Sequence, residues 1–143
     1  MHCDVDQENS VEHIRQAVEE IGVERIDHGS NALEDPELVA EIKKRGLGFT
    51  VCPISNSFVC DGIKGEAIRA MLDQGLRVTI NSDDPAYFGG YVLENLVRTQ
   101  ADLNLSLDEV VQFERNAFEI TWLPRALKDG YLAELEAYYK ANS

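Results

Sequence analysis

The segment Val78-Thr-Ile-Asn-Ser-Asp-Asp-Pro-Ala86 decides the fold, since a short apolar run is followed at once by a polar cluster. The residues from Leu76 to Asn81 have the composition of a buried strand, and Pro85 breaks it. Three comparable strands precede it, at residues 1–5, 25–28 and 48–52. Apolar strands that alternate with helices are typical of a parallel sheet covered by helices. The segment and the strands before it therefore predict an α/β fold.

The first helix is predicted from its start signal and its apolar spacing. Asn9 with Glu12 has the spacing of a capping box, and Gly22 ends the helix. Its buried face is expected to consist of Val11, Ile14, Val18 and Ile21.

Later helices are predicted from a proline at the first position or from a capping box. These starts are Asp35-Pro36 and Ser106 with Glu109, and a last helix is predicted after Pro124. One more helix covers residues 64–74, and from residue 90 onward helices follow one another without strands.

Composition limits the partners and the compartment. The 143 residues include 26 Asp and Glu against 13 Lys and Arg, a formal net charge of −13. This acidity argues against nucleic acid and anionic membrane as partners, because positive charge for binding phosphates is scarce. The three cysteines, Cys3, Cys52 and Cys60, have no CxxC spacing, which favours reduced thiols in a cytoplasmic protein.

Polar, ionisable side chains gather where the four predicted strands end. Right-handed crossovers place all four carboxyl ends at one edge of the sheet, where α/β folds hold their sites. The residues are His2 and Asp4 on the first strand, Asp27-His28-Gly29 after the second, Cys52-Pro-Ile-Ser-Asn56 after the third and Asn81-Ser-Asp-Asp-Pro85 after the fourth. Four consecutive strands with this pattern predict a functional site.

Each motif also has a purely structural interpretation. Asp27 could cap a backbone N–H in a turn, and Asp83 or Asp84 could cap the helix that Pro85 starts. Cys52 could be a residue that only packs in the hydrophobic core. The joint occurrence of four motifs favours a site over four separate explanations.

The residue types indicate metal-assisted hydrolysis. Histidine with aspartate suits Zn²⁺ or a similar divalent ion, and zinc makes water nucleophilic near neutral pH. A catalytic zinc normally has three protein ligands, and only His2 and Asp83 are well placed. A phosphatase-like use of Asp83 and Asp84 with Mg²⁺ is the weaker alternative, because no glycine-rich phosphate loop precedes a helix.

Three of these segments together resemble the adenosine/adenine deaminase family of the amidohydrolase superfamily. The matching segments are Gly22-Val-Glu-Arg-Ile-Asp-His-Gly29, Val51-Cys-Pro-Ile-Ser-Asn56 and Val78-Thr-Ile-Asn-Ser-Asp-Asp-Pro-Ala86, with Asn116-Ala-Phe-Glu119 in the final helices. The resemblance covers essentially the whole chain, in the family's order. It implies a TIM (β/α)₈ barrel that deaminates a purine base or nucleoside with a mononuclear zinc.

The resemblance implies a role for each matching residue. His2 would bind zinc, and His28 would orient the hydrolytic water. Asp83 would bind zinc and activate that water, while Asp84 would accept a hydrogen bond from the purine ring.

Two departures from the family pattern qualify these roles. No His-x-His precedes His2, so the chain resembles only strands five to eight of the barrel plus the C-terminal helices. We therefore expect residues 1–143 to be the C-terminal half of a longer deaminase, inactive alone because two zinc ligands are missing. His2-Cys-Asp-Val5 replaces the family's His-Ala-Gly-Glu, whose glutamate protonates the purine. Asp4 or Asp6 could replace that glutamate, since strand alternation puts both on the face of His2.

An incomplete barrel has consequences for assembly. It would expose both sheet edges and an apolar inner face, so we expect the chain to self-associate. The alternative to a deaminase is a non-catalytic half-barrel module that assembles with itself or with another chain.

Overall fold

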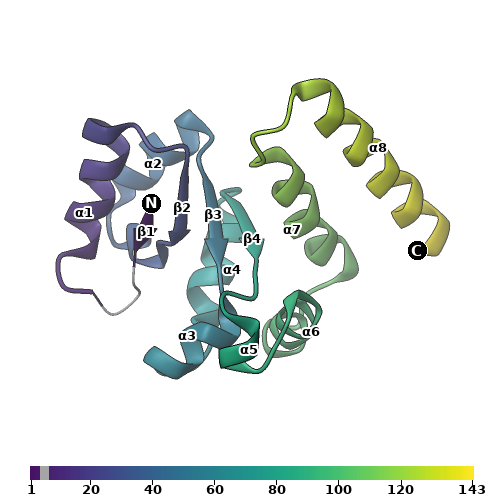
Figure 1. The fold of residues 1–143 in the computed structure, drawn as a ribbon, viewed down its shortest axis with the longest axis horizontal. Helices are drawn as coiled ribbons and strands as arrows, with labels where there is room; N and C mark the ends of the chain where they lie inside the picture. The colour runs from purple at the N-terminus through teal and green to yellow at the C-terminus, as the bar shows by residue number, and fades with distance from the viewer. Residues whose placement is uncertain (4–6) are drawn as a thin grey trace.

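The computed structural model describes residues 1–3 and 7–143 and contains a four-stranded parallel sheet (Figure 1). The strands lie side by side in sequence order, and each pairs in parallel with the next. Their bounds are β1 His2–Cys3, β2 Arg25–His28, β3 Gly48–Val51 and β4 Arg77–Ile80. The parallel α/β architecture predicted from the alternation of strands and helices is confirmed.

Helices connect the strands and form the C-terminal part of the chain (Figure 1). Before β4 they are α1 Ser10–Gln16, the π-helix η1 Ala17–Ile21, the 3₁₀ helix η2 Ser30–Glu34, α2 Pro36–Arg45, α3 Pro53–Val59 and α4 Gly65–Asp73. After β4 they are α5 Pro85–Phe88, α6 Val92–Leu103, α7 Leu107–Glu119 and α8 Arg125–Asn142. α7 packs against β4, and α8 packs on α7 at the outside of the molecule.

One face of the sheet forms the core with the helices. Strand side chains point alternately to the two faces, so every second strand residue belongs to this core. The strand residues in the core are Cys3, Ile26, Phe49, Val51, Val78 and Ile80. The helices contribute, among others, Ile14, Val18, Leu38, Ile42, Ile68, Met71 and Phe113.

The opposite face of the sheet is polar. Asp27, Thr50 and Thr79 alternate with the core residues of β2, β3 and β4 and therefore occupy this face. The Thr50 hydroxyl donates a 2.6 Å hydrogen bond to Asp27 Oδ1, and Asn81 Nδ2 donates one of 2.7 Å to the Thr79 hydroxyl. The prediction of an apolar inner face is therefore wrong. Threonine favours strands as valine does, so the strands are predicted correctly, but its hydroxyl makes the face that it occupies polar.

The first helix differs from its prediction at both ends. Asn9 has a left-handed backbone with φ of 57°, and its side chain makes no capping hydrogen bond. Glu12 instead accepts a 3.3 Å hydrogen bond from Gln16, so the predicted capping box is absent. After Gln16 the helix widens into η1, and Ile21 is 75 % exposed rather than buried. A π-helix turns each residue less than an α-helix does, so the 3.6-residue spacing no longer predicts the buried face.

The other two predicted caps are confirmed. Asp35 Oδ1 accepts 3.0 Å hydrogen bonds from the backbone N–H groups of Glu37 and Leu38 at the start of α2. Ser106 and Glu109 form the capping box at the start of α7.

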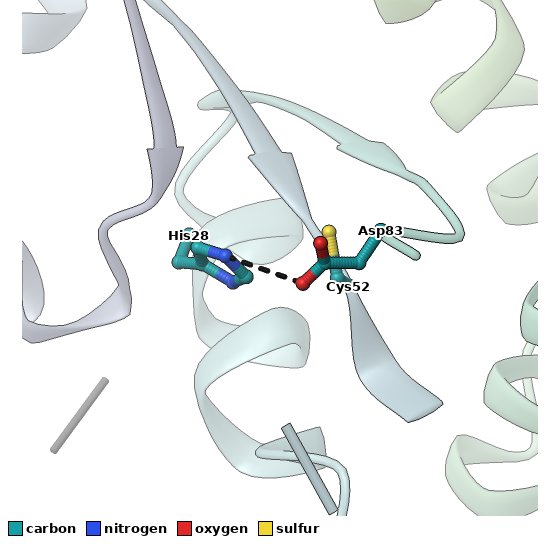
Figure 2. Close-up of side chains that lie close together, drawn as sticks. All are labelled: His28, Cys52 and Asp83. Atoms are coloured by element: carbon teal, nitrogen blue, oxygen red, sulfur yellow. Dashed lines mark ion pairs between the residues drawn. The ribbon is translucent and has the colours of Figure 1, made fainter. Parts of the chain in front are cut away.

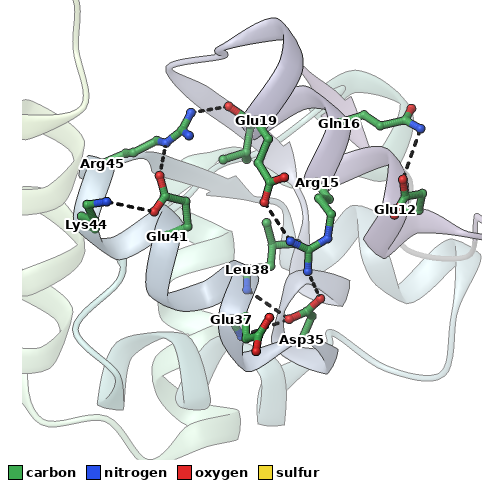
Figure 3. A network of polar contacts seen from close by, with 11 residues as sticks. Glu12, Arg15, Gln16, Glu19, Asp35, Glu37, Leu38, Glu41, Lys44 and Arg45 are labelled. Carbon is green, nitrogen blue, oxygen red and sulfur yellow. Dashed lines mark hydrogen bonds and ion pairs between the residues drawn. The ribbon is translucent and has the colours of Figure 1, made fainter.

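A network of charged side chains joins α1, η1 and α2 (Figure 3). Arg15 contacts Asp35 and Glu19, and Arg45 pairs with Glu41. Partly exposed pairs of this kind contribute little energy each, so the network adds little to the stability that the apolar core provides.

In the described residues, no helix is both long and apolar enough to cross a membrane. Cys3, Cys52 and Cys60 all lie in the described ranges, and none of them forms a disulfide.

Candidate functional site

The carboxyl ends of the strands bring the predicted polar residues together. His2 lies on β1 and His28 is the last residue of β2, while Cys52 and Asp83 follow β3 and β4. Because the strands are parallel and neighbouring, these positions meet at one edge of the sheet. Figure 2 shows the side chains of His28, Cys52 and Asp83 converging there.

His28 and Asp83 face each other across the site. His28 Nε2 lies 3.7 Å from Asp83 Oδ2. The rings of His2 and His28 meet edge to face, with 4.9 Å between their centroids. His28 is buried, whereas Asp83 is exposed on the solvent side. The structure therefore brings together the residues to which sequence reasoning assigned zinc and water.

The two facing residues share an unusual backbone conformation. His28 and Asp83 are both left-handed, with φ of 59° and 57°. Non-glycine residues rarely adopt this conformation, and such strain clusters at functional sites. By strand alternation the side chain of His28 should point to the core, as that of Ile26 does. The left-handed backbone breaks this alternation, and the His28 ring instead lies against His2 and Asp83. The left-handed turn thus aims the imidazole into the site.

Ser55 is a site residue to which sequence reasoning gave no contact. The sequence predicts only a strand break at Pro53, but the structure has the helix α3 there, with Pro53 at its first position. The Ser55 hydroxyl, in the first turn of α3, donates a 2.7 Å hydrogen bond to Asp83 Oδ2. Proline directly after a strand suits a first helical position, and this signal could have indicated α3.

A cavity of about 210 Å³ contains all four residues assigned to metal, water and substrate. It is lined by His2, His28, Ser55, Asn56, Val59, Asp83, Asp84 and Phe88. Most of the lining residues have polar side chains, and Val59 and Phe88 are the apolar ones. The volume is below the roughly 300–1,000 Å³ of pockets for drug-sized ligands, so the cavity fits a small molecule.

The structural interpretations of the aspartates have different outcomes. Asp84 occupies the N-cap position of α5, but its side chain makes no capping hydrogen bond. Asp83 accepts its hydrogen bond from Ser55 rather than from a helix N–H. Asp27 has a structural contact, although its partner is the Thr50 hydroxyl and not a backbone N–H. The capping interpretation therefore fails for Asp84.

The candidate proton donors, Asp4 and Asp6, lie outside the described residues. Their assignment stays a prediction from the sequence.

The donor atoms at this edge suit a divalent metal ion. A nitrogen of His28, the sulfur of Cys52 and a carboxylate oxygen of Asp83 all lie within 4.8 Å of one another. His28 Nδ1 is buried and has no hydrogen-bond partner among residues 1–3 and 7–143. Imidazole, thiolate and carboxylate are the zinc ligands of proteins, so this group fits a divalent ion such as zinc, although its members share only Asp83 with the predicted pair of His2 and Asp83.

Cys52 differs from the core filler that the sequence suggests. It is 6 % exposed, and its sulfur lies beside His28 and Asp83. Burial, followed by the charges of Asp83 and Asp27, raises the pKa of the Cys52 thiol to about 12. The thiol therefore keeps its proton at neutral pH as long as no cation is bound.

Comparison with known proteins decides the family. The family model described as adenosine deaminase matches residues 6–138. The chain belongs to the adenosine deaminase family. It is 50 % identical over 141 residues to an uncharacterized deaminase of Schizosaccharomyces pombe and 42 % identical over 135 residues to an adenine deaminase of a Marinomonas species. The alignments cover 98 % and 93 % of this chain but only 42 % and 40 % of those relatives. The chain thus spans about two fifths of the length of the curated relatives it matches.

Solved structures agree with the assignment to the adenosine deaminase family. The crystal structure of adenine deaminase from Arthrobacter aurescens matches with a TM-score of 0.88 and 33 % identity, over 97 % of this chain and 42 % of that one. An amidohydrolase from Burkholderia ambifaria with bound Zn matches with a TM-score of 0.83 and 25 % identity, over 92 % and 37 %. The predicted fold, strands five to eight of a TIM barrel plus C-terminal helices, is confirmed.

Proposed function

We propose that this chain supplies metal-binding and substrate-binding residues of a zinc-dependent deaminase that acts on an adenine-type purine, as a base or a nucleoside. The observation that carries the proposal is the convergence of two histidines and two aspartates on one cavity, namely His2, His28, Asp83 and Asp84. The relatives named adenine deaminase support this reaction class. In the complete enzyme, residues 1–143 form the C-terminal half of the barrel.

His2 and Asp83 hold the metal in this proposal. A nitrogen and a carboxylate oxygen are donors that zinc takes in catalytic sites. When bound, zinc supplies the Lewis acidity that makes water nucleophilic near neutral pH. A catalytic zinc has three protein ligands, and these two residues leave that set incomplete. We therefore expect the 143-residue chain by itself to be inactive.

His28 and Asp83 control the attacking water. Their facing atoms, Nε2 and Oδ2, are 3.7 Å apart, which is too long for a direct hydrogen bond. One water in contact with both is oriented by His28 and gives its proton to Asp83. The hydroxide oxygen then adds to the purine carbon that carries the amine. Asp83 returns its proton to the amine nitrogen, and ammonia leaves as the carbon–nitrogen bond breaks.

Asp84 and the apolar wall hold the substrate. Asp84 is exposed and makes no capping bond, so its carboxylate can accept a hydrogen bond from a purine N–H. Val59 and Phe88 border the same cavity and suit a flat ring. Protonation of the purine ring falls to Asp4 or Asp6.

A chimeric enzyme tests this function. The matching 135 residues of the Marinomonas adenine deaminase are replaced by this chain, and zinc content and loss of adenine absorbance are measured. We expect a zinc-loaded, active chimera. Asp84→Asn should lower turnover about 10- to 100-fold, since a hydrogen bond to a charged group is worth about 1.5–3 kcal/mol.

Asp102→Asn is the matched control, because Asp102 is exposed on α6 and pairs only with Arg98 in the described residues. A folded chimera with neither zinc nor activity would reject the proposal. Full activity of Asp83→Asn would reject the role of Asp83.

We also propose that the isolated chain self-associates, as the half-barrel alternative requires. Among the described strands, β1 and β4 each pair on one side only, so both edges are available for pairing. α6 in addition exposes Val92, Leu93 and Val97. Light scattering over a concentration series should give a mass above that of the monomer. A clean monomer at high concentration contradicts self-association. If the chain folds and self-associates but the chimera that contains it is inactive, the result favours the non-catalytic module.

A further inference from the structure

Cys52 has no role in the proposed deaminase reaction, although it lies among the carboxyl ends of the strands. It directly follows β3, which lies between β2, the strand that ends at His28, and β4, the strand before the loop that carries Asp83. It lines a hollow of about 360 Å³ on the inner face of the sheet, together with His2, His28, Asn81 and Asp83 among others. The side chain of Cys52 therefore lines a hollow that is open to solvent, together with other groups that can bind an ion.

The three donor atoms nearly have the spacing of a metal site. A tetrahedral zinc site has bonds of about 2.0–2.3 Å, so its ligand atoms lie about 3.4–3.8 Å apart. The His28 Nε2 to Asp83 Oδ2 distance of 3.7 Å already meets this. The sulfur of Cys52 lies within 4.8 Å of a ring nitrogen of His28 and of a carboxylate oxygen of Asp83. A side-chain movement of up to about 1 Å would bring the three donor atoms to the spacing at which all of them can bind one ion.

We propose that His28, Cys52 and Asp83 form a second metal-binding mode, selective for soft divalent ions such as Cd²⁺ and Zn²⁺, which competes with the catalytic use of His28 and Asp83. Thiolate sulfur selects soft ions, whereas the His2 and Asp83 pair offers only nitrogen and oxygen. On binding, the sulfur–hydrogen bond breaks, the sulfur–metal bond forms and one proton passes to solvent. No oxidation or reduction takes place.

The other two cysteines do not have this setting. Cys3 is 1 % exposed and belongs to the core on the helix side of the sheet. Cys60 lies at the end of α3, where its sulfur is 2.9 Å from the Asn56 carbonyl oxygen. Only Cys52 joins histidine and aspartate in a group of possible metal ligands among the described residues.

Titration of the purified 143-residue chain with CdCl₂, without purine, tests the site. We expect an ultraviolet sulfur-to-cadmium charge-transfer band that saturates at one Cd²⁺ per chain. Cys52→Ser should abolish the band, and Cys60→Ser, the matched control, should keep it. His28→Gln and Asp83→Asn should weaken Cd²⁺ affinity by more than about 10-fold, since the loss of even an outer partner of a ligand costs that much.

Several results would overturn the inference: no band in the unsubstituted chain, an unchanged band in Cys52→Ser, or loss of the band in Cys60→Ser. Cys52→Ala, checked by circular dichroism, replaces Cys52→Ser should the latter fail to fold. The competition itself rests on the proposed function. In the active chimera Cd²⁺ should inhibit, and Cys52→Ser should relieve that inhibition. Since the band is measured without substrate, failure of the deaminase and failure of the thiolate site are separate results.

Discussion

The Ser55 hydroxyl donates a 2.7 Å hydrogen bond to Asp83 Oδ2, the carboxylate oxygen that faces His28. The bond joins the first turn of α3 to the loop after β4, across 28 residues of sequence. Ser55 is 5 % exposed, so its hydroxyl lies where solvent cannot replace it. Asp83 is therefore held in orientation by α3 as well as by its own strained backbone.

Ser55→Ala should release the Asp83 carboxylate. We expect the free energy of unfolding to fall by about 1 kcal/mol, because Asp83 is partly exposed and water can replace some of the lost bond. Metal affinity should also fall. Ser57→Ala is the matched control, since the Ser57 hydroxyl bonds the Ile54 carbonyl within α3. Urea unfolding and metal titration check the prediction, and equal effects of the two substitutions would contradict it.

Asn95 places α3 and thereby Ser55. It is fully buried, its Oδ1 accepts a 2.9 Å hydrogen bond from the Ile54 N–H, and its Nδ2 donates one of 2.8 Å to the Tyr91 carbonyl. Asn95→Ala should lower the free energy of unfolding by about 1–3 kcal/mol, the penalty for unpaired buried groups. Asn142→Ala, at the exposed end of α8, should leave urea unfolding unchanged. A neutral Asn95→Ala would show that α3 holds its place without this bond.

The strands and the residues at their ends could be predicted because both depend on local sequence. Arg25 to His28 forms a strand with the expected bounds, ended by Gly29. Parallel pairing in sequence order then follows from the helices between strands, and it brings His28 and Asp83 to one edge. Neither step requires knowledge of a contact between distant residues.

The contacts of Ser55 and Cys52 could not be predicted in the same way. Ser55 reaches Asp83 only because α3 has one orientation, and that orientation depends on the bond from Asn95, which is 41 residues away from Ile54. Cys52 has the strand parity of Thr50 and so faces the inner side of the sheet, but Asp83 lies near its sulfur only because of the loop conformation after β4, which no composition rule specifies. The polar contacts that complete the site are long-range, so periodicity and capping patterns carry no information on them.

Glu109 should make the stability of the chain depend on acid. Arg69 first, and then the backbone and hydroxyl of Ser106, hold the pKa of its carboxyl at about 2, below the ordinary 4.5. The unfolded chain therefore takes up the proton first as pH falls. The stabilisation is fully present above pH 4.5 and is lost as the pH falls through about 2. Glu109→Gln should lower the urea midpoint at neutral pH and match the unsubstituted chain near pH 2.

Glu134→Gln is the control for this pH series. Glu134 lies on α8, and its side chain has no hydrogen bond or ion pair to any other residue that the structure describes. Its midpoints should follow those of the unsubstituted chain at every pH. A Glu109→Gln deficit that stays constant down to pH 2 would show that the lost stability comes from packing and not from the charge.

Gly48 and Gly130 should respond in opposite directions to alanine. A Cβ at Gly48 would lie 2.4 Å from Cγ2 of Ile120, so Gly48→Ala must push β3 and the end of α7 apart. Overpacking of this kind lowers the free energy of unfolding by about 1–3 kcal/mol. At Gly130, inside α8, nothing lies within 4 Å of the added Cβ. Gly130→Ala should therefore raise the free energy of unfolding by about 0.5–1 kcal/mol, because alanine has a higher helix propensity than glycine. Urea unfolding of both variants checks the pair, and a Gly48→Ala chain as stable as Gly130→Ala would mean that Ile120 can move away without loss.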